Sequence, residues 1–80
     1  MVVASGFVEV DGMKNTGKIV GELKKRNMKI DYIETEKVIF LFERESFEDV
    51  RTEIDSLKNV EDVRNVHLTY YCFEGDGDEV

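Results

Sequence analysis

The segment from Gly12 to Ile19 has the spacing of a phosphate-binding loop. It reads GMKNTGKI, which fits the GxxxxGK part of the nucleotide-binding pattern, and it lies between a predicted strand and a predicted helix. The hydroxyl side chain that holds magnesium in that pattern is replaced by Ile19, so a metal contact needed for phosphoryl transfer is missing. We therefore interpret the segment as the start of a helix with basic residues, and we expect no nucleotide hydrolysis.

Residues that bind metals or act as nucleophiles are few in this chain. His67 is the only histidine and Cys72 the only cysteine, and their offset of five predicts that they lie on opposite faces of one strand. Asp76 and Asp78 lack the further oxygen ligands that a calcium loop requires. The sequence therefore predicts no metal site, no cofactor, no catalytic residues and no enzymatic activity.

Charge and hydropathy exclude two classes of partner. The net charge of -7 at pH 7 argues against a nucleic acid, because basic groups supply most of the affinity for phosphate backbones. No apolar run is long enough to span a membrane, and the first strand is not preceded by a basic stretch and a long apolar core. We expect a cytoplasmic protein that acts on neither nucleic acid nor membrane.

The elements that must position any binding residues follow from the apolar pattern. The 80 residues are enough for one domain, which we place at residues 1–74, followed by an acidic flexible tail at residues 75–80. The pattern predicts strands at residues 2–10, 28–34, 37–43 and 63–73 and helices at residues 15–27 and 46–58. This β-α-β-β-α-β order predicts an α+β ferredoxin-like sandwich: a four-stranded antiparallel sheet with both helices on one face.

The strand at residues 37–43 is apolar on both sides. Val38, Phe40 and Phe42 point one way, and Ile39 and Leu41 point the other, although a strand with one solvated face should alternate apolar and polar residues. We expect Ile39 and Leu41 to face the helices together with Val66, Leu68 and Tyr70 of the last strand. If the strand is turned over, Ile39 and Leu41 replace the two phenylalanines on the bare face, and an apolar platform remains.

The bare face is predicted to be a docking surface for a peptide or a partner chain, because large exposed apolar patches mark interaction sites. The same pattern also suits burial in a homodimer or covering by the tail, so the sequence leaves these alternatives open. Acidic residues at positions 43 to 49 gather where this strand meets the second helix, and they are either a solvated helix start or an attractor for a basic peptide. The expected peptide-binding residues are Phe7, Phe40, Phe42, Thr69, Tyr71 and Phe73, with Glu43 and Glu45 as the acidic contacts.

Three segments resemble the NapD family of small cytoplasmic chaperones. They are the hairpin IDYIETEKVIFLFE, the helix SFEDVRTEIDSLKNV and the last strand VEDVRNVHLTYYCFE, and the likeness covers roughly residues 30–75. The resemblance implies the ferredoxin-like fold and binding of the twin-arginine signal peptide of the periplasmic nitrate reductase catalytic subunit. It implies that the bare face holds this peptide, in a monomer or weak homodimer, until the molybdenum cofactor has been inserted.

Two other functions remain as alternatives on this fold. A ligand-sensing regulatory domain of the ACT type would act as a homodimer and bind a small molecule at the interface. An enzyme of the acylphosphatase kind would need an arginine and an asparagine on the loop after the first strand. Residues 11–17 contain Lys14 and Asn15 but no arginine, which argues against the enzyme.

Overall fold

The elements follow one another in the predicted β-α-β-β-α-β order. The computed structural model describes residues 1–73, so the predicted tail at residues 75–80 lies outside the described residues. The elements are β1 (Val2–Val10), the short 3₁₀ helix η1 (Met13–Asn15), α1 (Thr16–Lys25), β2 (Lys29–Glu34), β3 (Lys37–Arg44), α2 (Phe47–Leu57) and β4 (Val63–Phe73).

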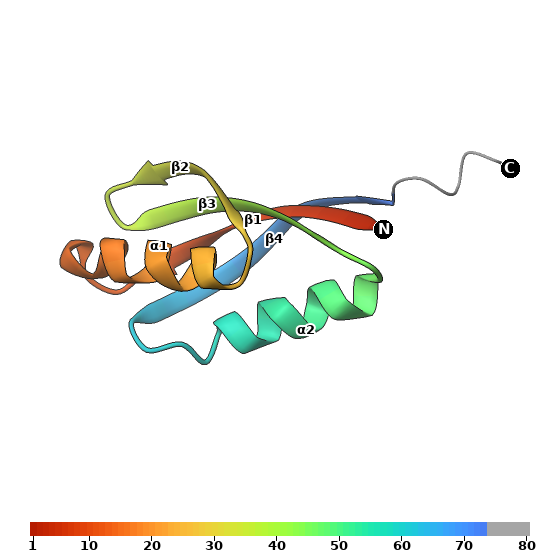
Figure 1. The fold of residues 1–80 in the computed structure, drawn as a ribbon. Helices are drawn as coiled ribbons and strands as arrows, with labels where there is room; N and C mark the ends of the chain where they lie inside the picture. Colours follow the sequence, from red (N-terminus) through yellow and green to blue (C-terminus); the bar gives the residue numbers. More distant parts are fainter. Residues whose placement is uncertain (74–80) are drawn as a thin grey trace, which may run out of the picture.

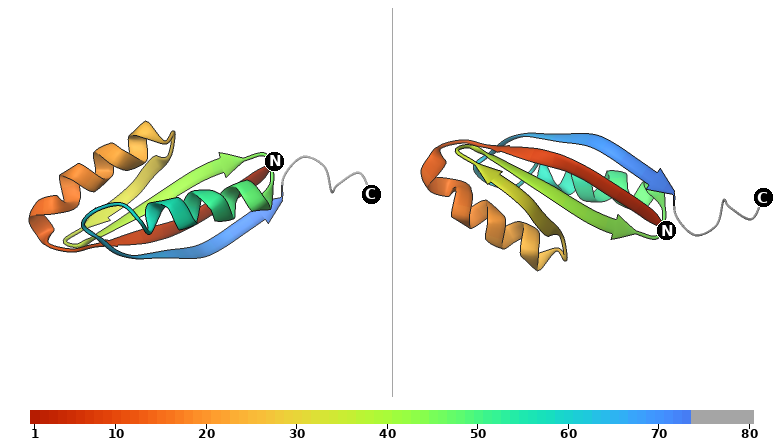
Figure 2. Two further views of the ribbon diagram at one scale, coloured as in Figure 1. Left: turned by 90° about the horizontal axis from the view of Figure 1, so that it is seen from below. Right: turned by 90° about the horizontal axis from the view of Figure 1, so that it is seen from above.

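The four strands form one antiparallel sheet in the order β2-β3-β1-β4. The strand β1 is central and pairs with both β3 and β4, while β2 and β4 are the edges. Both helices lie on the same side of the sheet, and the opposite side is bare (Figures 1 and 2). This is the predicted ferredoxin-like α+β sandwich.

The core lies between the sheet and the two helices. Every second residue of β1 points into it, from Val2 to Val10, because side chains alternate along a strand. The helices contribute Ile19 and Leu23 from α1 and Val50, Ile54 and Leu57 from α2. Each fully buried aliphatic side chain contributes roughly 1.5 to 3 kcal/mol, so this layer is the main source of stability.

The helix α2 forms as its sequence predicts. The hydroxyl of Ser46 accepts a hydrogen bond from the backbone N–H of Asp49 at 3.1 Å, which caps the first turn. Glu48 and Asp49 place negative charge at the positive end of the helix dipole.

The helix α1 is shorter than predicted. It ends at Lys25, because Asn27 adopts a left-handed conformation with φ of 64° and turns the chain toward β2. The N–H of Met28 then donates to the carbonyl oxygen of Leu23 at 3.1 Å, which satisfies one of the last helical carbonyls.

The segment from Gly12 to Ile19, which has the spacing of a phosphate-binding loop, forms η1 and the start of α1. The ammonium group of Lys18 lies 2.7 Å from an Asp62 carboxylate oxygen and 3.7 Å from one of Glu61. The hydrogen bond to Asp62 raises the pKa of Lys18 above its ordinary value. The charge of this lysine is therefore directed at two carboxylates of the chain itself.

Within residues 1–73, neither helix has the length and apolar character that crossing a membrane requires.

Candidate functional site

The side of the sheet away from the helices, called the open face below, has an apolar centre. Residues that pair across neighbouring strands point to the same face, so the register identifies its members. Phe7 pairs with Ile39, Ser5 pairs with Leu41, and Ile39 pairs in turn with Tyr32 of β2. The apolar centre consists of Val3, Phe7, Ile39 and Leu41, with Tyr32 on one side and Tyr70 on the other.

The prediction that Phe40 and Phe42 lie on the open face is wrong. Phe40 is 0% and Phe42 3% exposed, and their ring centroids lie 5.7 Å apart in the core. Ile39 and Leu41 take their places on the open face, which is the alternative orientation of the strand. The two larger rings fill the space under two helices, where the smaller side chains would leave cavities.

A β-bulge in β4 changes the orientation of its second half. Ser5 of β1 pairs with Tyr70, but the next residue, Gly6, pairs with Leu68. Thr69 is therefore an extra residue with no partner of its own in the register. An extra residue shifts the alternation by one position, so every side chain after it points to the face opposite to the expected one.

The bulge accounts for four wrong assignments on β4. Tyr71 and Phe73 were expected on the open face and lie on the helix side, where they pair with buried residues of β1. Tyr70 was expected under the helices and lies on the open face. Cys72 also lies on the open face, so it shares a face with His67 instead of lying opposite to it.

One hydrogen bond and one glycine accommodate the bulge. The hydroxyl of Thr69, a predicted peptide-binding residue, donates to the carbonyl oxygen of Ser5 at 3.1 Å. Gly6 leaves room for the close approach of β4, because a Cβ atom at this position would clash with the carbonyl oxygen of His67. The hydroxyl of Thr69 therefore has a structural partner within the sheet.

Phe7 lies on the open face, as predicted, and its ring is already packed. The imidazole of His67 stacks on it with a centroid distance of 4.6 Å, and the ammonium of Lys37 lies 4.5 Å from the ring centroid. The Nε2 atom of His67 is also 3.7 Å from a carboxylate oxygen of Glu9. Polar side chains therefore surround this end of the apolar centre, and the more accessible apolar surface lies toward Val3 and Leu41.

The opposite end of the sheet is acidic. Glu43 lies on the open face beside Val3, and Glu45 follows the end of β3. Glu48 and Asp49 follow in the first turn of α2. None of these four carboxylates, called the acidic end below, forms an ion pair with another residue of the range 1–73.

A pocket of about 380 Å³ adjoins the acidic end. It lies beside the part of β3 that extends past the start of β2, since β2 begins opposite Leu41. Its apolar wall is made of Val3, Leu41 and Phe42, and its polar wall of Asn27, Lys29, Glu43 and Arg44. A larger pocket, of about 610 Å³, lies at the other end beside the β2–β3 hairpin and mixes glutamates with Lys37 and Arg64.

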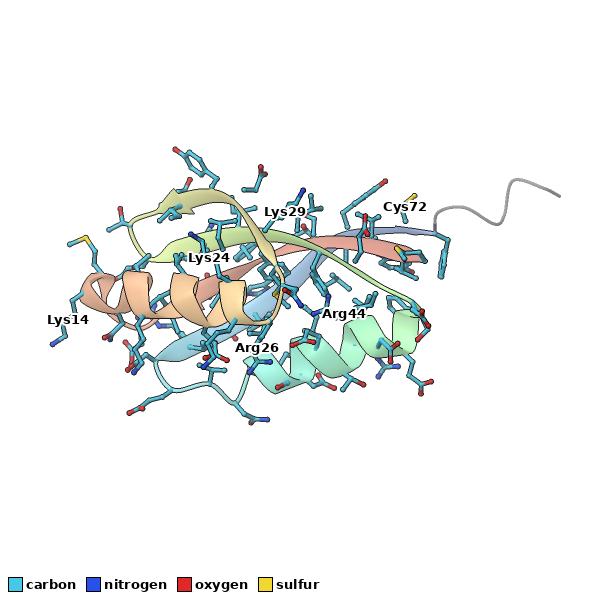
Figure 3. All side chains as sticks on the ribbon, in the orientation of Figure 1. Lys14, Lys24, Arg26, Lys29, Arg44 and Cys72 are labelled. Atoms are coloured by element: carbon cyan, nitrogen blue, oxygen red, sulfur yellow. The ribbon has the colours of Figure 1, made fainter. Side chains whose placement is uncertain are left out.

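The charge of Arg44 is largely neutralised within the fold. Its Nη2 donates to a carboxylate oxygen of Glu53 at 3.1 Å and to the carbonyl oxygen of Arg26 at 2.9 Å. Arg26 donates to the other carboxylate oxygen of Glu53 at 2.8 Å, and Figure 3 shows the two arginines where α1 and β3 approach α2. Burial alone would raise the pKa of Glu53, but the hydrogen bonds from both arginines outweigh it and lower the pKa. This network fixes the end of β3, and with it the position of Glu43.

Three aromatic rings meet on the helix side at the same end of the sheet. The ring centroid of Phe47, at the start of α2, lies 4.6 Å from that of Tyr71, and Tyr71 meets Phe73 edge-on at 6.0 Å. Tyr71 and Phe73 remain 47% and 59% exposed. We call these three residues the end cluster. The spacing of Phe47 with Val50 and Ile54 places it on the apolar face of α2, and nothing in the local pattern signals its contact with β4.

Among residues 1–73, no three His, Cys, Asp or Glu side chains are grouped in a way that could hold a metal ion. Comparisons of the chain with protein-family models, with curated proteins and with solved structures find no match.

Proposed function

We propose that this protein is a small cytoplasmic chaperone for the twin-arginine signal peptide of a molybdenum-containing, nitrate reductase-like oxidoreductase. The apolar segment of the peptide binds to the open face, and its arginine pair binds at the acidic end. Binding delays export of the enzyme until its molybdenum cofactor has been inserted. In this role the protein is not an enzyme and needs no cofactor of its own.

The observation that carries the proposal is the uncovered apolar centre of the open face. Leu41 is 37% exposed although it lies on the inner strand β3, and Tyr32 is 57% exposed on the edge strand β2 beside it. Contiguous apolar surface of this kind is typical of interaction sites. An apolar peptide segment would remove it from water.

Charge complementarity supports an arginine-bearing peptide as the occupant. Glu43 is the cross-strand neighbour of Val3, so a carboxylate adjoins the apolar centre directly. An arginine next to an apolar segment can therefore form a charge-assisted hydrogen bond at the end of the surface that holds the segment. The identity of the peptide and of the enzyme comes from the resemblance of residues 30–75 to the NapD family.

The test is a titration of the protein into a labelled synthetic peptide with two adjacent arginines followed by an apolar segment, read by fluorescence anisotropy. We expect saturable binding in the micromolar range, and weaker binding when both arginines are replaced by glutamine. Absence of binding at high micromolar protein concentration would contradict the proposal.

A pair of matched variants tests the surface. Leu41→Thr should weaken peptide binding by roughly 3- to 10-fold, because burying an aliphatic side chain contributes about 1.5 to 3 kcal/mol and Leu41 starts partly buried. Ile33→Thr is the control, since Ile33 is 48% exposed but pairs with Val38 and so lies on the helix side of the edge strand. Equal loss in both variants would place the peptide elsewhere.

A further inference from the structure

The end cluster leaves aromatic surface exposed, and acidic residues flank its Phe47 in the chain. Tyr71 is 47% and Phe73 59% exposed, and the ring of Phe47 packs on Tyr71 at a centroid distance of 4.6 Å. Glu45 and Glu48 lie two residues before and one residue after Phe47 in the chain, and neither forms an ion pair within residues 1–73. Exposed rings next to such carboxylates attract a cation.

The positive groups near the end cluster do not fully neutralise its acidic residues. Arg44 is held by Glu53 and lies over the ring of Phe42, with its guanidinium carbon 4.9 Å from the ring centroid. The positive end of the α2 dipole is offset by the first-turn acids Glu48 and Asp49. Two further cations lie at this end: Arg51, which is one turn of α2 after Phe47 and three positions after Glu48, and the α-ammonium of Met1, since Val2 pairs with Phe73. The carboxylates of Glu45, Glu48 and Asp49 outnumber these two cations, so the local charge favours an incoming positive group.

We propose that the end cluster is the subsite that binds a guanidinium group of the peptide, with Glu45 and Glu48 as its hydrogen-bond acceptors. This inference rests on the proposed function and assigns the arginine contact to particular residues. A guanidinium stacks on an aromatic face and donates in a fixed fork to carboxylates, whereas an ammonium does neither as well. The subsite should therefore prefer arginine over lysine.

The path from the open face to this subsite is short. Cys72 lies on the open face and the next residue, Phe73, lies on the helix side, so the end of β4 connects the two surfaces. Figure 1 shows the start of α2, the N-terminus and the end of β4 at the same end of the molecule. A peptide that leaves the open face past Val3 and Glu43 reaches the end cluster around the end of the sheet.

The experiment measures the preference for arginine over lysine in the wild-type protein and in Tyr71→Leu. Two labelled peptides are compared, one with an Arg-Arg pair and one with a Lys-Lys pair before the same apolar segment. We expect the wild type to bind the Arg-Arg peptide roughly 5-fold or more tightly than the Lys-Lys peptide, and Tyr71→Leu to reduce this ratio to about 2 or less. Leucine keeps apolar contact with Phe47 but removes the ring.

Tyr32→Leu is the control, because Tyr32 is a tyrosine of similar exposure, 57%, at the other side of the open face. It should weaken both peptides by the same factor and leave the ratio unchanged. Circular dichroism checks that each variant is folded. If Tyr71→Leu fails to fold, Phe73→Leu carries the same test, since Phe73 is 59% exposed.

The possible outcomes separate this inference from the proposed function. If neither peptide binds the wild type, the proposed function fails, and this inference fails with it. If both peptides bind but the wild type has no preference, or if Tyr71→Leu and Phe73→Leu keep the preference, the guanidinium subsite is overturned while the open-face proposal stands. A preference lost in these variants and kept in Tyr32→Leu supports the subsite.

Discussion

The carboxylate of Glu53 in α2 links the end of α1, through Arg26, to β3, through Arg44. It accepts hydrogen bonds from Arg26 at 2.8 Å and from Arg44 at 3.1 Å, and its side chain is only 20% exposed. Burial alone would raise its pKa, but the two arginines lower it below the usual glutamate value. A carboxyl group whose pKa is lower in the folded chain stabilises the fold when it is ionised.

We expect Glu53→Gln to lower the free energy of unfolding by about 1 to 2 kcal/mol at pH 7, because charge-assisted hydrogen bonds are lost. This contribution is present above the pKa of the unfolded chain, near 4, and is lost as the pH falls through the lower folded pKa. The difference between variant and wild type should therefore shrink below about pH 4 in urea unfolding curves.

Asp55→Asn is the control for this measurement. Asp55 forms a surface ion pair with Lys58 at 3.8 Å with both side chains more than half exposed, so its loss should change stability by less than about 0.5 kcal/mol. A Glu53→Gln effect that is the same at pH 3 and pH 7 would show that the ionised carboxylate is not what stabilises the fold.

The strand β3 contributes to both the core and the proposed binding surface through two adjacent residues. Phe40 is 0% exposed among the buried side chains, and Leu41, the next residue, is 37% exposed on the open face. The orientation of β3 is set by its pairing with β1, where Phe40 lies opposite Gly6 and Leu41 opposite Ser5. Truncation of Phe40 and truncation of Leu41 should therefore lower the free energy of unfolding by different amounts.

We expect Phe40→Ala to lower the free energy of unfolding by about 3 to 5 kcal/mol, because it leaves a cavity under both helices. Leu41→Ala should cost less than about 1 kcal/mol, since part of its side chain is in water already. Chemical denaturation of both variants measures the two effects. Similar losses would mean that the open face is buried in solution, for example in a dimer.

The chaperone and the ACT-type alternative differ in whether the open face is free or covered by a second copy of the chain. The ACT-type alternative requires a homodimer, whereas the chaperone needs the open face accessible to the peptide. Each chain carries a net charge of -7, which opposes self-association and favours a cationic partner.

We expect light scattering to give the mass of one chain for the free protein and of one chain plus one peptide for the complex. The measurement should be made at the concentrations used for the peptide titration. A stable dimer that Leu41→Thr dissociates would identify the open face as a subunit interface, and would favour the ACT-type alternative over the chaperone.

The order of the elements, the fold class and the existence of an apolar bare face follow from the apolar pattern of the amino-acid sequence. The apolar residues Val50, Ile54 and Leu57 recur with one helical period after the N-cap residue Ser46, so this segment predicts a single structure. The strand β3 does not, because it is apolar on both sides, and hydrophobicity alone cannot choose between two phases of a two-residue period.

Which side chains face outward depends on contacts between distant segments of the folded chain. The volume between the sheet and two helices selected Phe40 and Phe42 for the core, a choice that depends on packing between distant segments. The bulge at Thr69 arises from the register between β1 and β4, which lie about sixty residues apart in the chain, and it reversed the orientation of Tyr71 and Phe73. Such pairing leaves no local pattern, which is why the end cluster became visible only in the folded chain.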